Sequence, residues 1–496
     1  MVKRNESTVP LHGGYKPQLI VQVDTKKGGV NTQLQPLMSS YKPEKVGEPP
    51  VQAVSANGST IPLCNTRDVE VGEYDPFQHR KLDHPTSDMD TLIHLLKGSL
   101  GSGILAMPLA FANAGLFLGL ICTFAIGAIC TYCVHILVKS AHELCRRTKV
   151  PSLGFAEVAE AAFLAGPKGF RPWAKFAKAS INLFLVIDLL GCCCVYIVFV
   201  AKNLKQVVDF YTPDGYHFDT RLYMAAMLPL LIPVNLIKNL KFLSPLSMIA
   251  NILVAIGMSV TFYYIFSDLP SFDSQPAYEN VTKLPIFFGT AIFALEGIGV
   301  VMPLENNMKH PSHFIGCPGV LNTGMFFVVA LYASTGFFGF LKYGQATEGS
   351  ITLNLPQDQP LAQSVKIMIA VAIFFTYALQ FYVPMDIIWK ALKNNFSTER
   401  QNFANTAIRL CLVFVTVVLA ILVPNLGGFI SLVGAVCLSM LGLIFPATID
   451  LVTFYEEPGL GKYNFRLYKN LFLIFFGLVG FLTGTYVSIR EIIESY

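Results

Sequence analysis

The chain has 496 residues, of which 53% are apolar and only 14% are charged, and its mean hydropathy is +0.52. Soluble domains carry roughly 25% charged residues, so this composition excludes an ordinary soluble globular protein and indicates a membrane protein. The net charge of +4 is too small to indicate a nucleic-acid partner.

The first 90 residues are polar, contain no apolar run of ten residues, and have Pro, Gly, Ser and Thr scattered through them. Such a segment cannot bury enough apolar surface to fold by itself. We therefore expect residues 1–90 to be a disordered cytosolic tail and residues 91–490 to be the transmembrane domain.

Eleven apolar segments follow the tail, and each is close to the roughly 20 residues that a helix needs to cross about 30 Å of hydrocarbon. The fourth is short and contains Pro229 and Pro233, and only a turn signal at Pro424 and Asn425 separates the ninth from the tenth. The predicted spans cover approximately residues 91–112, 116–138, 177–201, 222–238, 242–266, 284–304, 318–341, 363–388, 405–423, 427–452 and 468–489.

Lys and Arg are unequally divided between the two ends of these spans. The side that carries the N-terminal tail has 18 of them in its loops and span ends, and the opposite side has 7. Cytosolic loops are enriched in Lys and Arg, so we expect the N-terminus in the cytosol. The sequon at Asn280 then lies in a non-cytosolic loop and predicts a glycoprotein, whereas those at Asn5, Asn57 and Asn395 lie on the cytosolic side.

Two spans that lie five spans apart share a glycine and proline pattern. Residues 101–109 read G-S-G-I-L-A-M-P-L, and residues 297–304 read G-I-G-V-V-M-P-L. Gly costs about 1 kcal/mol and Pro about 3 kcal/mol in a helix interior, so the pattern predicts that the first and sixth helices are broken. Matching breaks in two halves are typical of inverted-repeat transporters, with the substrate between them. The alternative is that these glycines only permit close helix packing.

The expected fold is therefore an all-α polytopic membrane protein. Spans one to five and six to ten would form a five-plus-five inverted repeat, and the eleventh would be an addition. Backbone groups freed at a break inside the membrane are tolerated where they line a cavity, so the substrate site is expected at the two breaks.

Ordered motifs across this domain carry a resemblance to a known family. They lie at residues 92–110, 113–115, 293–299, 302–306, 354–356 and 376–384. Together they resemble the proton-coupled amino acid transporters of the amino acid/auxin permease group, most of all the insect branch, over about residues 88–490. The resemblance implies eleven spans with a LeuT-like core. It also implies symport of small neutral amino acids with protons at the plasma membrane or the lysosome.

Ionisable residues inside spans are costly and are therefore candidates for function. His94 lies seven residues before Gly101, and an ordinary histidine has a pKa of about 6.5, so a modest pH difference can change its charge. The resemblance implies that His94 responds to protons; the alternative is an interfacial histidine satisfied by loop groups. Glu296 adjoins the second break, where a carboxylate must be paired or protonated, and it could carry the proton or hold a substrate ammonium.

Five further charged residues lie within the spans or at their ends. Glu305 ends the sixth span, where a structural cap or a gate is expected. Lys97 either extends its ammonium group to the interface or takes part in the site. Asp188, in the middle of the third span, either pairs with a buried cation or amide or takes part in the site. Asp386 and Asp450 lie at cytosolic span ends and are expected to be solvated.

A zwitterionic substrate needs partners for its two charged ends. We expect the backbone N–H groups of Gly101, Ser102 and Gly103 to bind the carboxylate. The carbonyls freed near Gly297 and Gly299 would bind the ammonium group.

Aromatic and polar side chains complete the expected substrate site. Phe293, one turn before the second break, would cap the pocket and limit the size of the substrate, or would only pack in the core. Tyr377 belongs with Thr376 and Gln380 to a polar stripe on the eighth span, which is expected to line the pocket.

The sequence contains no enzyme signature. It has no phosphate-binding glycine-rich loop, no His-Glu-x-x-His motif and no pair of Cys-x-x-Cys motifs, so we expect no catalysis, cofactor or metal. Transport would then be secondary rather than driven by ATP. The alternative function is an amino acid sensor that signals to cytosolic partners with little net transport.

Overall fold

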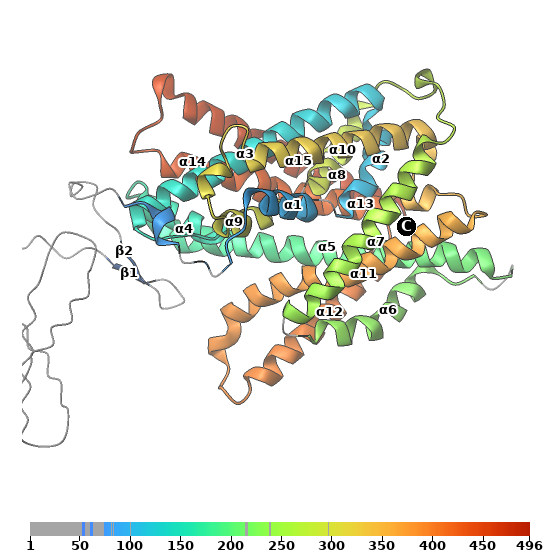
Figure 1. Cartoon of the computed structure of the whole chain (residues 1–496), viewed down its shortest axis with the longest axis horizontal. Helices are drawn as coiled ribbons and strands as arrows, with labels where there is room; N and C mark the ends of the chain where they lie inside the picture. The colour runs from blue at the N-terminus through green and yellow to red at the C-terminus, as the bar shows by residue number, and fades with distance from the viewer. Residues whose placement is uncertain are drawn as a thin grey trace, which may run out of the picture. The chain divides into compact units, whose positions relative to one another are not determined.

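The computed structural model is predominantly helical over the residues that it describes (Figure 1). These are residues 52–54, 60–62, 74–80, 82, 84–99, 101–213, 217–237, 240–295 and 297–496. Most of the predicted tail and the candidate Glu296 lie outside the described residues.

The described residues form fifteen α-helices, a π-helix, several short 3₁₀-helices and one short β-hairpin. The hairpin pairs β1 (Gln52–Val54) with β2 (Thr60–Pro62) in antiparallel register. The helices of the first half are α1 (Asp88–Ser99), α2 (Gly103–Ala114), α3 (Leu116–Thr148), α4 (Phe155–Ala165), α5 (Ala174–Tyr211), α6 (Thr220–Asn235) and α7 (Leu240–Phe266). The second half contains α8 (Leu284–Ala294), α9 (Ile298–Asn306), α10 (Val320–Tyr343), α11 (Pro360–Leu392), α12 (Gln401–Leu422), α13 (Leu426–Val433), a π-helix (Gly434–Ile444), α14 (Phe445–Thr453) and α15 (Phe465–Glu494).

All eleven predicted spans fall on helices, but the number long enough to cross a membrane is smaller. In the described residues, nine helical segments meet this condition, and the bent pair α1 and α2 gives a tenth. The exception is α6, the predicted fourth span, which has 16 residues. At 1.5 Å per residue it is about 24 Å long, less than the roughly 30 Å of a bilayer core.

Both predicted helix breaks are present. α1 and α2 are bent by 56° across the residues that join them, and α8 ends at Ala294, before α9 begins at Ile298. The half-helix after each break contains the proline of the shared motif, Pro108 in α2 and Pro303 in α9. Proline has no backbone N–H to donate, so the helix near each break lacks one of its own backbone hydrogen bonds.

The half-helices α2 and α8 are mostly buried, whereas α1 and α9 are partly exposed. α2 contacts α8 and α10, α1 contacts α9 and α10, and α11 packs against both α5 and α7 (Figure 1). Small residues allow the close approach of α2 to α10. A Cβ atom at Gly336 would lie 2.4 Å from the ring of Phe111, and one at Gly339 would lie 2.5 Å from the ring of Pro108.

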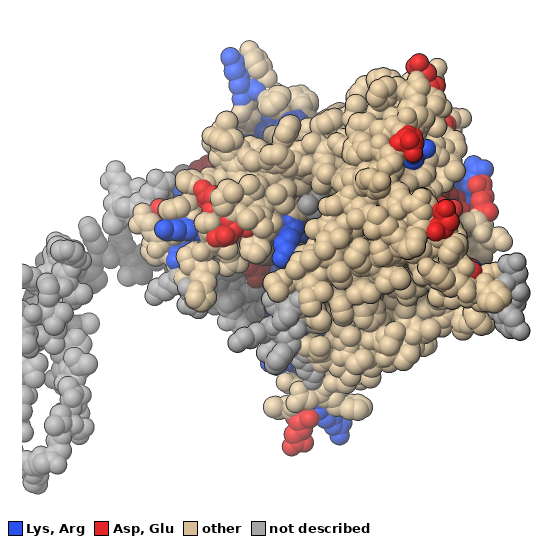
Figure 2. All heavy atoms as spheres, turned by 45° about the vertical axis from the view of Figure 1, so that its right-hand side comes forward, with Lys and Arg blue, Asp and Glu red and all other residues tan. Residues whose placement is uncertain are grey.

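The outer surface has the character of a lipid-facing surface. Large apolar side chains are exposed along α3 and α15, among them Ile121, Phe475 and Leu482. Figure 2 shows a broad stretch of the visible face without charged side chains, with Lys, Arg, Asp and Glu around it. Helices with such exteriors are stable in lipid, because their backbone hydrogen bonds are satisfied internally.

Part of the predicted tail packs on the membrane domain. Thr86 pairs with Met308 in a parallel β-bridge. The N–H of Thr86 donates to the carbonyl of Asn307 at 2.9 Å, and the carbonyl of Thr86 accepts from the N–H of Lys309 at 2.9 Å. The membrane domain therefore includes residues upstream of the predicted boundary at residue 91. The sequence did not show this because the partner backbone follows α9, more than 200 residues later.

Asp450 was predicted to be solvated, and this prediction is wrong. Its side chain is 1% exposed and accepts hydrogen bonds from Asn470 at 2.7 Å and from Lys469 at 3.1 Å, both on α15. Asp386 is 40% exposed and pairs with Lys390 on its own helix, so it is the more solvated of the two. The difference arises because α14 packs against α15, which the local sequence cannot reveal.

The exposed loop between α7 and α8 provides a test of the predicted topology. Asn280 is exposed there, and its Oδ1 accepts a hydrogen bond from the N–H of Thr282 at 3.1 Å. We expect Asn280→Gln to abolish the gel shift that glycosidase treatment produces, because glycans are added on the non-cytosolic side. A shift that persists in this variant but disappears in Asn395→Gln would contradict the predicted topology.

Candidate functional site

A cavity of about 180 Å³ lies where the two helix breaks meet. Residues at the end of α1 and the start of α2, at the end of α8 and the start of α9, and on α5, α11 and the π-helix form its wall. Leu185, Val383 and Leu441 supply much of its apolar surface. This is the position at which inverted-repeat transporters bind their substrates.

Helix ends give the cavity its electrostatic character. α1 and α8 end at its wall, and α2 and α9 begin there. Aligned peptide dipoles place about half a positive charge at a helix N-terminus and about half a negative charge at a C-terminus. Ser102, which precedes α2, makes no capping hydrogen bond with its side chain, so it does not occupy the N–H groups of the first turn. The cavity can therefore accept an anionic group at α2 and a cationic group at the end of α8.

The structure brings six of the predicted substrate contacts to this one cavity. These residues lie on the first and sixth predicted spans, whose shared glycine and proline pattern led us to predict one substrate site between them. Glu296, the seventh, lies outside the described residues. The six that line the cavity are Gly101, Ser102, Gly103, Phe293, Gly297 and Gly299.

Tyr377 does not line the cavity. Its side chain is 1% exposed, and its hydroxyl shares a hydrogen bond of 2.8 Å with the hydroxyl of Thr416 on α12. Gln380, three residues later on α11, does line the cavity. Of the polar stripe on α11, Tyr377 thus contacts α12 and Gln380 lines the cavity. The rotation of α11 in the bundle decides which residue takes which place.

His94 does not line the cavity either. Its side chain is exposed on α1, four residues after Asp90, and Lys97 is exposed one turn further along. A role of His94 in proton coupling would therefore have to act through the movement of α1 or through water, not through contact with the substrate.

Three polar residues extend the predicted set. Asp188 on α5 lines the cavity and is 2% exposed, and Tyr196 lines it two turns further along the same helix. Ser99, which the sequence analysis missed, also lines the cavity and is 3% exposed; its carbonyl accepts a hydrogen bond from the hydroxyl of Tyr332. Its position two residues before Gly101 was the available signal. Among the described residues, no three His, Cys, Asp or Glu side chains gather in a way that could hold a metal ion.

The glycines of the two motifs have different surroundings. A Cβ atom at Gly103 would lie 2.5 Å from the Cα atom of Ala294, so this glycine is needed for backbone contact between the two breaks. A Cβ atom at Gly101 would meet nothing within 4 Å, and one at Gly299 would lie 3.9 Å from Leu185. These two glycines therefore border open space.

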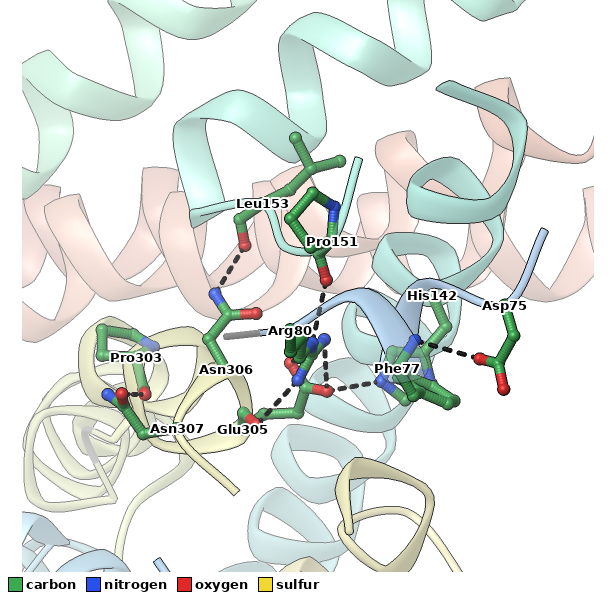
Figure 3. Close-up of polar contacts among 10 residues, drawn as sticks. All are labelled: Asp75, Phe77, Arg80, His142, Pro151, Leu153, Pro303, Glu305, Asn306 and Asn307. Atoms are coloured by element: carbon green, nitrogen blue, oxygen red, sulfur yellow. Dashed lines mark hydrogen bonds and ion pairs between the residues drawn. The ribbon is translucent and has the colours of Figure 1, made fainter. Parts of the chain in front are cut away.

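A second polar group, the Glu305 cluster, consists of Glu305, Arg80 and His142 (Figure 3). The fully buried carboxylate of Glu305 lies 3.1 Å from the guanidinium group of Arg80 and 2.7 Å from Nε2 of His142. Arg80 also donates to the carbonyl of Pro151 at 2.8 Å and lies over the ring of Phe77. The cluster thus joins α9, α3 and the segment before α1. The sequence suggested a cap or gate at Glu305 but not its two partners.

Comparisons with known proteins agree with these features. Residues 84–490 match the family described as "Transmembrane amino acid transporter protein". The chain is 45% identical over 424 residues to the "Proton-coupled amino acid transporter-like protein pathetic" of Drosophila melanogaster, and the aligned region covers 86% of this chain and 89% of the relative. It is 26% identical over 414 residues to the "Probable amino acid transporter skat-1" of Caenorhabditis elegans, with 82% and 90% covered.

Among solved structures, the inward-facing conformation of Mhp1 superposes with a TM-score of 0.50 at 13% sequence identity, covering 87% of this chain and 95% of Mhp1. At this identity the likeness shows the fold alone, and it confirms the predicted LeuT-like architecture. The family match and the similarity to the Drosophila relative both extend over most of the chain, and they confirm the resemblance seen in the motifs. The chain belongs to the transmembrane amino acid transporter family.

Proposed function

We propose that this protein is a secondary active transporter that carries small neutral amino acids together with protons across the plasma membrane or the lysosomal membrane. The observation that carries the proposal is a small cavity that residues of both helix breaks line, with helix ends of both signs in its wall. A neutral amino acid presents one carboxylate and one ammonium group, and so it matches these helix ends.

The size of the cavity supports a small substrate. Its volume of about 180 Å³ lies below the roughly 300 Å³ at the lower end of pockets for drug-sized ligands. Phe293, Leu185 and Val383 contribute bulky apolar groups to the wall, which leave little space for a long side chain. These features agree with the glycine, alanine and proline that the resemblance to the proton-coupled amino acid transporters implies as substrates.

The proposal is tested by uptake of radiolabelled glycine into proteoliposomes containing the purified full-length chain. Uptake is expected to rise several-fold when the outside pH is about 5.5 rather than about 7.5, to fall on addition of a protonophore, and to be independent of sodium. A protein that binds glycine without concentrating it under any of these gradients would instead be a sensor. Sodium-dependent accumulation without acid stimulation would contradict proton coupling.

Proton coupling is proposed to involve His94, with Glu296 as the competing carrier. We expect His94→Ala to lose the stimulation by outside acid, because a neutral, non-titrating side chain cannot respond to pH. Glu296→Gln is expected to lower uptake at both pH values, because it removes a carboxylate beside the second break. Uptake against outside pH, corrected for surface expression, is the measurement. The assignment is reversed if His94→Ala retains full acid stimulation while Glu296→Gln transports equally at both pH values.

The same proposal includes the orientation in the membrane. The excess of Lys and Arg on the side of the tail supports a cytosolic N-terminus and a cytosolic location for residues 1–90. Protease protection of an N-terminal epitope tag in sealed vesicles tests this independently of glycosylation.

A further inference from the structure

Asp188 is the one charged side chain among the described residues that line the cavity. It lies within α5 and is 2% exposed. Leu185, Leu189 and Tyr196 line the same cavity. Asp188 and Leu189 lie three and four residues after Leu185, and Tyr196 lies seven residues after Leu189, so all four share one helical face. The carboxylate therefore belongs to the face of α5 that adjoins the proposed substrate.

An ammonium group inside this cavity needs a partner, because a buried charge without a compensating charge or hydrogen bonds is very costly. We infer that Asp188 binds the ammonium group of the substrate, and that this contact makes the protein select amino acids over carboxylic acids that lack an amino group. The inference rests on the proposed function, since it assigns one end of the same substrate. It adds a formal negative charge from α5 to the partial negative charge at the end of α8.

The other polar groups of the wall fit this orientation. The N-terminus of α2 attracts the substrate carboxylate, so the ammonium group is directed toward the remaining wall, to which α5 and the end of α8 contribute. The hydroxyl of Ser99 supplies a second hydrogen-bond partner for the ammonium group in this part of the wall. This hydroxyl has no hydrogen-bond partner within the described part of the chain, and a Cβ atom at Gly297 would lie 3.2 Å from it. This hydroxyl can accept a hydrogen bond from the ammonium group beside the second break.

The first test uses the unmodified protein. Glycolate is glycine with a hydroxyl group in place of the ammonium group, so the two ligands differ only at the atom assigned to Asp188. In competition with radiolabelled glycine on the purified full-length chain, unlabelled glycine is expected to be at least tenfold more potent than glycolate. Equal potency would overturn the inference, whereas failure of glycine itself to bind would mean that the proposed function is wrong.

The second test uses Asp188→Asn, which keeps the size of the side chain and removes its charge. Glycine potency is expected to fall at least tenfold while glycolate potency stays the same or improves, so that the ratio between them collapses. This ratio does not depend on the amount of folded protein. The matched control is Asp386→Asn, at an exposed carboxylate of α11 outside the cavity, which should keep the ratio of the unmodified protein.

Two outcomes of the second test would overturn the inference. The ratio of glycine to glycolate potency could stay unchanged in Asp188→Asn, including the case in which only the acid stimulation of uptake is lost, which would make Asp188 a proton carrier. Alternatively, the folded variant could bind neither ligand, which would make Asp188 a determinant of the shape of the cavity. If Asp188→Asn does not fold, the comparison of glycine and glycolate on the unmodified protein decides the matter.

Discussion

Glu305→Ala is expected to lower the free energy of unfolding by roughly 3–5 kcal/mol, the usual cost of removing one partner from a buried ion pair. The carboxylate is fully buried, and the side chain of Arg80 is 4% exposed, so the guanidinium group would keep its burial and lose its counter-charge. Thermal unfolding of the purified protein in detergent measures the effect. The matched control is Asp386→Ala, whose exposed pair with Lys390 should contribute less than about 1 kcal/mol.

The Glu305 cluster is expected to act as a gate as well as a cap. Arg80→Ala removes the side-chain contacts that join the segment before α1 to Glu305 of α9 and to Pro151, so α1 and α9 are expected to separate more easily at this end. Cys145 on α3 is 1% exposed and lies three residues after His142, a member of the cluster. Its labelling by a maleimide in permeabilised vesicles should become several-fold faster in Arg80→Ala.

The exposed Cys317 provides the internal control for this experiment, because its labelling should not change. Lower thermal stability with unchanged labelling of Cys145 would show that the cluster is a structural cap only.

Gly299→Val is expected to reduce glycine uptake at least tenfold while the melting temperature stays nearly unchanged. Its side chain would enter open space bordered by Leu185 and take volume from a cavity of only about 180 Å³. Gly103→Val is expected to reduce uptake as strongly but also to destabilise the protein, because its side chain would collide with the backbone of Ala294. Uptake and thermal unfolding, measured on the same preparations, separate loss of substrate space from loss of packing.

Gly169→Val is the control for both variants, since this exposed glycine lies in the loop before α5 and a Cβ atom there would meet nothing within 4 Å. Normal uptake by both Gly103→Val and Gly299→Val would contradict the location of the substrate site.

The sequence alone determined where the apolar spans lie and which two are broken, but it did not predict α4 between the second and third spans. Hydrophobic runs of about 20 residues identify spans because the bilayer imposes their length. Gly and Pro identify breaks because their effect on a helix acts through the residue's own backbone. The matched patterns at residues 101–109 and 297–304 therefore predicted five residues that the structure places around one cavity, and Phe293 just before the second pattern is a sixth. The predicted fourth span is the exception. α6 has only 16 residues, and a helix of this length is too short to cross the bilayer even where it is apolar.

Only the tertiary structure decided which side chains face one another. Tyr377 meets a hydroxyl 39 residues away on α12, and Arg80 meets Glu305 at a separation of 225 residues. Asp450 is buried because α15 supplies its partners. Such contacts depend on the rotation and depth of each helix in the bundle, which all the packed surfaces determine together. A local pattern shows that a polar residue lies on a helix, but not which neighbour will satisfy its charge or hydrogen bonds.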